Sequence, residues 1–263
     1  MAKYYYLFKV SVERTIKELI RYKFNSFSNI LILYVVFTAM FLGIKSFGMS
    51  FGISPIDMGD NLEGFIVGYF LWTIMMMAYA GVAYGIIYDA SRGTLEQLNM
   101  SDLRLSTIVT VRSISDLIVD LLISIILLYI IMATTNYRLQ IKLFSILPPI
   151  FIGIFSILGI GLIFGGLALI FKKVQSLLNI VQYILVAFLM ISPTSKIING
   201  LIPFRPTIDC VLLTVMRGYS LMDFSIFDYM VMVANSVLYF TTGLIVFNKS
   251  VKIAKKKGLL GQY

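Results

Sequence analysis

Histidine is absent from this 263-residue sequence, and cysteine and tryptophan each occur once. Without histidine the chain lacks the usual imidazole metal ligand, every histidine-dependent triad and the commonest general base. The lone cysteine, Cys210, excludes an internal disulfide and a cysteine-based zinc site. Charged residues make up only 13% of the chain, whereas about 25% is usual for a soluble domain. These absences argue against a soluble enzyme with histidine or metal chemistry.

Apolar residues are abundant instead, at 59% of the chain, and the mean hydropathy is +0.91. A run of about 18 or more apolar residues with few charges predicts a membrane-spanning helix. Six runs reach or approach this length, so we predict an all-α polytopic membrane protein with a single transmembrane domain over residues 1–263. The predicted spans are 28–44, 65–88, 114–133, 147–171, 177–192 and 229–247. The fifth is short, and only Lys172, Lys173 and a few neighbours separate it from the fourth, which predicts a hairpin.

The basic residues predict the orientation of these spans. With the N-terminus inside, 16 of the 22 lysines and arginines fall on inner segments. The positive-inside rule then places both termini, including the tail 248–263, in the cytoplasm. Nucleic-acid binding is an alternative explanation of the formal net charge of +9. Because the charges are spread over the inner loops, we expect no nucleic-acid partner.

Residues 1–25 have an amphipathic helical pattern. The apolar side chains that share one face are Tyr5, Phe8, Val12, Ile16 and Leu19. Charges interrupt the segment throughout, which disfavours a cleavable signal. We predict a helix that lies in the inner membrane interface, with a plain basic flank as the alternative.

The outer segment 193–228 has two apolar patches, each too short to cross roughly 30 Å of hydrocarbon at about 1.5 Å per residue. We predict short extracellular helices before the last span that dip into the outer leaflet, with an amphipathic surface loop as the alternative. Arg205 and Arg217 are candidates to meet an anionic cargo. We predict no metal site, because the carboxylates lack histidine or cysteine neighbours and only a hard cation such as calcium would suit them: Asp209, Asp223 and Asp228.

The segment between the second and third predicted spans is the most informative. Gly93 is predicted to end the preceding helix, and Thr94 to cap a new helix with Gln97 as its capping-box partner. Ser101 and Asp102 predict a second cap before the third span. The product is a short helix across the inner membrane face.

This short helix, within residues 93–102, would present Glu96 and an apolar side to a partner. The apolar side would consist of Leu95, Leu98 and Met100. A bare connecting loop needs no such element, whereas a docking partner does.

The same segment resembles a pattern of the membrane subunits of type-2 ABC exporters, E-x-x-x-G-T-L-E-x-L-x-x-[ST]-P. Asp89 stands at the acidic position, and Asp102 replaces the usual proline. The resemblance implies a coupling helix that docks in a groove of a cytosolic ABC ATPase subunit. The residues it assigns to ATPase coupling are Gly93, Thr94, Leu95, Glu96, Gln97, Leu98, Ser101 and Asp102.

The resemblance also implies a dimer with a second permease subunit, identical or different, whose interface and substrate path involve spans two and five. The candidates on span two are Trp72, Met76, Gly81 and Gly85. Glycines four residues apart let helices approach closely, so ordinary packing is the alternative for this pair. The same spacing recurs at Gly161 and Gly165.

Asp116 and Asp120 lie one helical turn apart near the start of the third span. Carboxylates inside a membrane are functional-site hypotheses by default, so a stand-alone proton-coupled carrier is one alternative function. We favour the simpler interpretation, an ion pair between Arg112 and Asp116 near the interface. An intramembrane enzyme is disfavoured because no glutamate lies within a predicted span.

No phosphate-loop motif G-x-x-x-x-G-K-[ST] occurs in the sequence. We therefore expect no enzyme activity and no cofactor bound by this chain, with ATP and Mg²⁺ bound by the partner ATPase. The predicted function is the permease subunit of an ATP-driven exporter in the cytoplasmic membrane, surrounded by membrane lipids. A drug, peptide or lipid-like molecule is the expected substrate, and export of a polysaccharide or lipid-linked glycan is the alternative.

Overall fold

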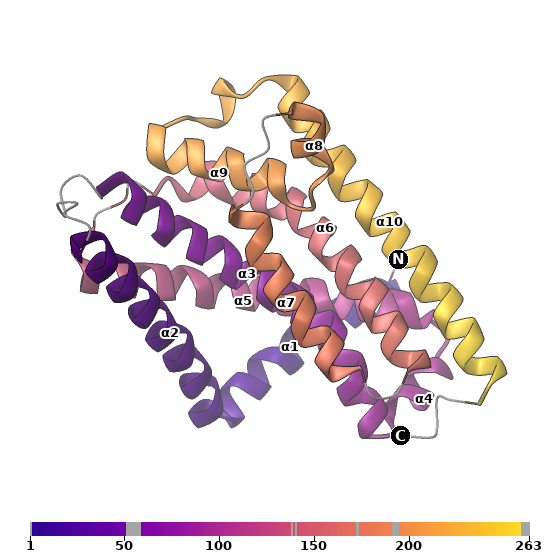
Figure 1. The fold of residues 1–263 in the computed structure, drawn as a ribbon. Coiled ribbons are helices and arrows are strands. Elements are labelled where there is room, and N and C mark those ends of the chain that lie inside the picture. Colours follow the sequence, from indigo (N-terminus) through magenta and orange to yellow (C-terminus); the bar gives the residue numbers. More distant parts are fainter. Residues whose placement is uncertain are drawn as a thin grey trace.

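The computed structural model describes residues 2–50, 59–137, 139, 141–171, 174–190 and 195–258, and these residues are all-α (Figure 1). The long helices are α1 (Ala2–Arg21), α2 (Lys23–Ser50), α3 (Gly59–Ser91), α5 (Leu105–Thr135), α6 (Leu143–Ile170) and α10 (Ile226–Lys256). The shorter ones are α4 (Thr94–Asn99), α7 (Gln175–Met190), α8 (Lys196–Leu201), α9 (Arg205–Arg217) and the 3-10 helix η1 (Leu221–Asp223). The predicted fold class is confirmed at this level.

Five of the described helices are long and apolar enough to cross a membrane, namely α2, α3, α5, α6 and α10. They contain five of the six predicted spans, apart from Phe171, which directly follows α6. The other span, 177–192, overlaps α7, whose 16 residues rise only about 24 Å against roughly 30 Å of hydrocarbon. Residues 191 and 192 lie outside the described part of the chain, and the six-span count remains a prediction.

Helix α6 runs through the middle of the bundle between α3 and α10, and glycines allow the close contacts. A Cβ atom added to Gly159 would lie 2.2 Å from the backbone oxygen of Tyr239, and one on Gly243 would lie 2.4 Å from the backbone oxygen of Gly159. On the side facing α3, a Cβ on Gly161 would lie 2.8 Å from Cβ of Val82. The spacing at Gly161 therefore serves packing within the chain, because no larger residue fits there.

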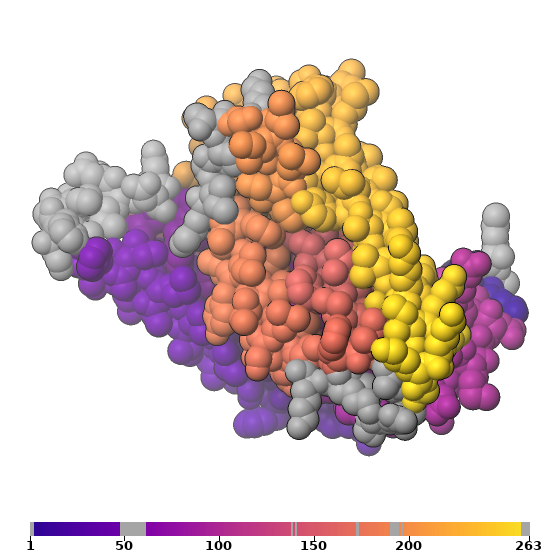
Figure 2. Space-filling view, turned by 45° about the vertical axis from the view of Figure 1, so that its right-hand side comes forward, coloured from indigo at the N-terminus to yellow at the C-terminus, as the bar shows by residue number. Residues whose placement is uncertain are grey.

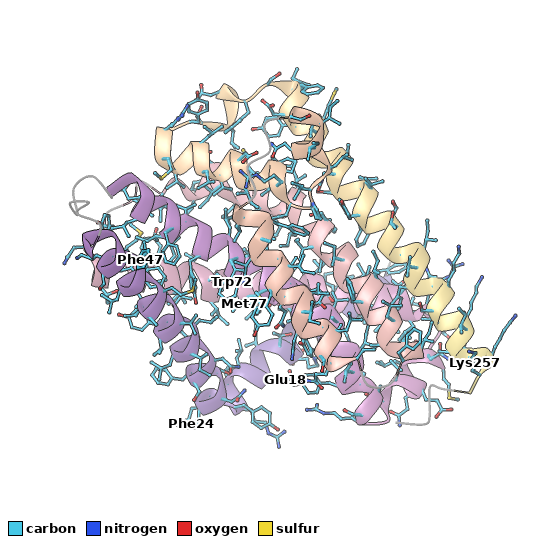
Figure 3. All side chains as sticks on the ribbon, in the orientation of Figure 1. Glu18, Phe24, Phe47, Trp72, Met77 and Lys257 are labelled. Atoms are coloured by element: carbon cyan, nitrogen blue, oxygen red, sulfur yellow. The ribbon has the colours of Figure 1, made fainter. Side chains whose placement is uncertain are left out.

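Helices α1 and α2 form a V beside the bundle (Figure 1). Only 11% of the apolar window of α2 is buried, and Figure 3 shows Phe24 and Phe47 near its two ends. An aromatic contact attaches α2 to α3, with the ring centroids of Phe37 and Tyr69 5.2 Å apart. The hydroxyl of Tyr69 also donates a hydrogen bond to the backbone oxygen of Leu33, at 2.6 Å.

Helix α1 packs along α5, and its predicted apolar face is only partly covered. Phe8, Val12 and Leu19 are half-buried, whereas Tyr5 and Ile16 are exposed. Part of this face therefore packs against the rest of the chain, and part is exposed. Its position in the membrane interface stays a prediction.

Short helices α8 and α9 occupy the segment for which they were predicted, at the opposite end of the bundle from α4 (Figure 1). We call these two ends the α9 end and the α4 end. Asn235 of α10 holds the connection between α8 and α9. Its amide donates to the backbone oxygens of Gly200 and Ile202, at 2.7 and 3.0 Å, and its side-chain oxygen accepts from the backbone N–H of Phe204.

The suggestion that Arg205 meets an anionic cargo is wrong. Its side chain is only 6% exposed and forms an ion pair with Asp209, at 2.7 Å. The same guanidinium donates to the backbone oxygens of Phe188 and Leu189 in the last turn of α7, at 3.4 and 3.0 Å. Arg205 thus joins α9 to the end of α7, where a cation complements the helix dipole. Arg217 is exposed.

Candidate functional site

Helix α4 lies across the end of the bundle, between the ends of α3 and α5. Gly93 has φ of +69°, a left-handed conformation that favours glycine and turns the chain out of α3. Leu95 is fully buried against the rest of the chain, whereas Glu96 is exposed and Leu98 is half-buried. The predicted helix break at Gly93 is confirmed. The buried position of Leu95 makes it an anchor of α4 rather than a residue available to a partner.

The predicted capping box at Thr94 and Gln97 is wrong. The N-cap residue of α4 is Gly93, and the cap has no side-chain hydrogen bond. The Thr94 hydroxyl points back instead and lies 3.0 Å from the backbone oxygen of Asp89 and 3.2 Å from its Oδ1. Thr94 therefore fastens α4 to the last turns of α3.

The predicted second cap is also wrong. Helix α5 has Arg104 as its N-cap residue, without a side-chain hydrogen bond. The Ser101 hydroxyl instead donates to the backbone oxygen of Leu98, at 2.8 Å, within the turn that leaves α4.

The favoured ion pair between Arg112 and Asp116 is replaced by another. Nη1 of Arg112 donates to Oδ2 of Asp89 at 2.9 Å, and the two side chains are 22% and 24% exposed. Asp89 therefore binds both Thr94 and Arg112, which connects α3, α4 and α5 at one point. The i,i+4 spacing predicted the wrong partner because Asp89 reaches the same guanidinium from a neighbouring helix.

Asp116 bonds to α1 rather than to its own helix. The Thr15 hydroxyl donates to its carboxylate, and Nη2 of Arg14 lies 3.9 Å away. We name Arg14, Thr15, Asp89, Thr94, Arg112 and Asp116 the Asp89 network. It links α1 through α5 to α3 and α4. Asp120, one turn further along α5, is half-buried and has no ion pair within 4 Å among the described residues.

Asp102, the residue at the usual proline position, forms a second link to α1. Its carboxylate accepts a hydrogen bond from Nζ of Lys3 at 2.7 Å. This hydrogen bond and the attraction between the two charges lower the pKa of Asp102 and raise the pKa of Lys3. Both groups therefore stay charged near neutral pH, and the connection between α4 and α5 is tied to the first turn of α1.

A cleft of about 900 Å³ opens between α1, α3 and α5, and the Asp89 network forms part of its wall. Its lining is rich in both signs of charge. The basic residues are Arg14, Lys17, Arg21, Arg92 and Arg112, and the acidic ones are Glu13, Glu18, Asp89 and Asp116. Figure 3 labels Glu18, one of these acidic residues, on α1. Such a mixture suits ion pairing between helices and contains no cluster of ligands for a metal.

The four candidates for the dimer interface on α3 do not share one face. Gly81 lies nine residues after Trp72, which at about 100° per residue is half a turn of helix away. Gly81 and Gly85 line the cleft, and a Cβ added to either would have no atom within 4 Å. Trp72 and Met76 are half-buried on the other side, where Trp72 lies 5.2 Å from Tyr69 between ring centroids. One straight partner helix cannot contact all four.

A family model described as ABC-2 type transporter matches residues 6–215, which include α4 and the whole Asp89 network. The chain belongs to the ABC-2 type transporter family. It is thus a multi-pass membrane protein and a transport subunit of an ABC transporter, and the ATPase that the family implies is a separate partner. The comparison with curated proteins gave no match.

Sequence reasoning missed the contacts that hold α4 in place. The sequence marks Asp89 only as the acidic position of the family pattern and Lys3 only as one of the basic residues on the inner segments. The five-residue spacing from Asp89 to Thr94 across a helix-breaking glycine was the one available signal. The pairing of Lys3 with Asp102 spans 99 residues and had no local signal.

Proposed function

We propose that this permease exports its substrate across the cytoplasmic membrane as one half of a dimer, with α4 docked in the ATPase. ATP and Mg²⁺ bind to the ATPase, and α4 carries its movements to the spans. The observation that carries the proposal is the anchoring of α4. Leu95 is buried, Asp89 holds Thr94, and Glu96 and Gln97 face outward.

The contacts at the α4 end support a cytoplasmic location for both termini and a span formed by α7. Lys3 of α1 pairs with Asp102, and the last turns of α10 line a cleft with residues 99 and 101–106. A chain whose two ends lie at the same side of the membrane must cross it an even number of times. The five long apolar helices therefore require one more crossing, and α7 is the apolar helix available for it.

Two exposed surfaces support a dimer. Helix α2 is largely uncovered by its own chain, and the glycine face of α3 leaves room beside Gly81 and Gly85. Glycine faces let helices from separate subunits approach closely. We propose the glycine face, rather than Trp72 and Met76, as the contact on α3.

An apolar groove supports a drug-like, peptide or lipid-like substrate over a polysaccharide. It has a volume of about 440 Å³ and lies between α6, α7, α8 and α10 (Figure 2). Its lining includes Phe164, Ile184 and Phe188, and the one hydroxyl there, of Tyr239, already donates to the backbone oxygen of Leu201 at 2.6 Å. A glycan would find few hydrogen-bond partners in such a groove.

The test is Glu96→Arg in the permease co-expressed with its ATPase. Because Glu96 is exposed, we expect the permease to fold normally but to lose at least about tenfold in ATPase binding, as expected for roughly 1.4 kcal/mol or more at a docking contact. The measurements are ATPase co-purification and ATP turnover in the reconstituted complex.

The matched control is Arg217→Glu, a charge reversal at an exposed residue of the α9 end. It should leave ATPase binding unchanged. Equal binding by the Glu96→Arg permease and the control would contradict the role of α4. A permease that transports without any ATPase would contradict the function itself and favour a stand-alone carrier.

A further inference from the structure

A second cleft lies at the C-terminal end of α4, along the connection that leads to α5. It has a volume of about 580 Å³ and is formed by residues 99 and 101–106 and by the last turns of α10. The side chains that α10 contributes are Asn248, Val251, Lys252 and Lys255. Because Asn99 is the last residue of α4, the cleft begins where the docking helix ends.

The cleft has an excess of positive charge that the described residues do not neutralise. Arg104, Lys252 and Lys255 line it and are exposed. Its one carboxylate, Asp102, is already bonded to Lys3 at 2.7 Å. Within the described part of the chain, no carboxylate lies within 4 Å of any of the three cations. The cleft is therefore suited to an acidic group from outside the chain.

The cleft stands away from the hydrocarbon core of the membrane. Helix α10 has 31 residues and rises about 46 Å, which exceeds roughly 30 Å of hydrocarbon. Lys252 and Lys255 lie in its last two turns, three residues apart, and so share one face of the helix. This end of α10 projects toward the same side as α4.

We propose that this basic cleft binds an acidic segment of the partner ATPase, as a second contact beside α4. The inference rests on the proposed function of α4. Only three of the eleven lining residues are apolar, namely Leu103, Leu105 and Val251. An anionic lipid would bring acyl chains that need an apolar surface, whereas an acidic peptide segment needs polar walls and cations. The polar lining therefore favours a protein ligand.

The first test is zero-length carbodiimide cross-linking of the purified permease–ATPase complex, which joins lysine amines to carboxylates in direct contact. We expect peptides that link Lys252 or Lys255 to an aspartate or glutamate of the ATPase. Mass spectrometry identifies both partners of each link. If the complex contains the ATPase but neither lysine links to it, the cleft is not a contact and the proposal fails.

The second test is the double variant Lys252→Glu with Lys255→Glu. Its matched control is Lys256→Glu with Lys257→Glu, which makes the same charge change outside the cleft at the end of α10 (Figure 3). Loss of two exposed ion pairs predicts roughly two- to thirtyfold weaker ATPase binding at low salt, with a smaller difference at high salt. The control should bind the ATPase as the unaltered permease does. Equal weakening in both variants would overturn the proposal.

Two further outcomes separate the sources of failure. Glu96→Arg with no effect, together with a strong effect of the cleft variant, would overturn the docking role of α4 and leave the cleft as the main contact. The other outcome is a cleft variant that keeps normal ATPase affinity but has lost the unaltered permease's preference for phosphatidylglycerol vesicles over phosphatidylcholine vesicles. In that case the ligand is a lipid and the proposal is wrong.

Discussion

Asp89 uses both oxygens of one carboxylate to join three helices. Oδ2 accepts a hydrogen bond from Arg112 of α5, and Oδ1 lies 3.2 Å from the hydroxyl of Thr94 in α4. Both charged side chains are about three-quarters covered. Because water and salt screen a covered ion pair poorly, this pair contributes more to stability than the exposed pairs on α1.

We expect Asp89→Asn to lower the stability of the isolated permease by about 1–3 kcal/mol, because a covered, charge-assisted hydrogen bond is lost. Unfolding by a denaturing detergent in mixed micelles would measure the change. Glu13→Gln is the control, since its pair with Lys17 is exposed and worth about 0–1 kcal/mol. If both substitutions have the same effect, Asp89 does not hold the helices together.

At the scale of the helix, two identical glycine spacings have different uses. Gly161 and Gly165 of α6 pack against Val82 and Ile86 of α3, whereas Gly81 has no neighbour within reach of a Cβ. The sequence motif indicates only that one face of a helix carries small residues. Whether another helix of the same chain lies against that face depends on the whole arrangement of the bundle.

Alanine substitution separates these uses. Gly159→Ala should destabilise the permease by about 1–3 kcal/mol or prevent folding, because the new methyl group meets the backbone of α10. Gly81→Ala should leave the stability of the separated subunit unchanged or slightly raise it, because alanine has a higher helix propensity than glycine. In the proposed dimer, Gly81→Ala should weaken self-association in detergent, measured by analytical ultracentrifugation. Unchanged self-association would exclude the glycine face from the dimer contact.

At the scale of the whole molecule, the two ends of the bundle differ in chemistry. The α4 end holds the Asp89 network, the cleft of mixed charge and the basic cleft, whereas at the α9 end Arg205 and Asn235 hold α8 and α9 against α7 and α10. The carboxylates of Asp223 and Asp228 accept backbone N–H groups from Ser220 and Ser225 there, in two capping boxes. Asp209, Asp223 and Asp228 therefore each have a structural partner.

Cysteine labelling tests the topology, because the natural Cys210 is buried and only 5% exposed. Labelling of cells with a membrane-impermeant maleimide should modify Arg217→Cys and Ser195→Cys but not Gln97→Cys or Gln175→Cys. All four positions are exposed in the structure. Labelling of Gln175→Cys and Ser195→Cys from the same side would mean that α7 does not span the membrane.

Much of the fold follows from local pattern. Apolar run length predicted six spans, five of which fall in long apolar helices, and Gly93 predicted the break before α4. Both predictions depend on residues close in the sequence. The capping predictions failed at Thr94 and Ser101, although a Ser-x-x-Asp signature does form capping boxes at Ser220 and Ser225. A hydroxyl near the start of a helix can bond to any acceptor that packing brings close, and the Thr94 hydroxyl bonds to Asp89.

The sequence by itself determined that this chain is a membrane-embedded helical permease without an ATP-binding loop, because hydropathy and motif are properties of short segments. Only the tertiary structure decided which charges meet. Arg112 pairs with Asp89 rather than with Asp116, and Lys3 pairs with Asp102, which lies 99 residues away in the sequence. Ion pairs form between groups that packing brings within about 4 Å, where the attraction depends steeply on distance and on exclusion of water. That packing also buried Leu95 and bonded Thr94 to Asp89, which anchors α4 to the bundle.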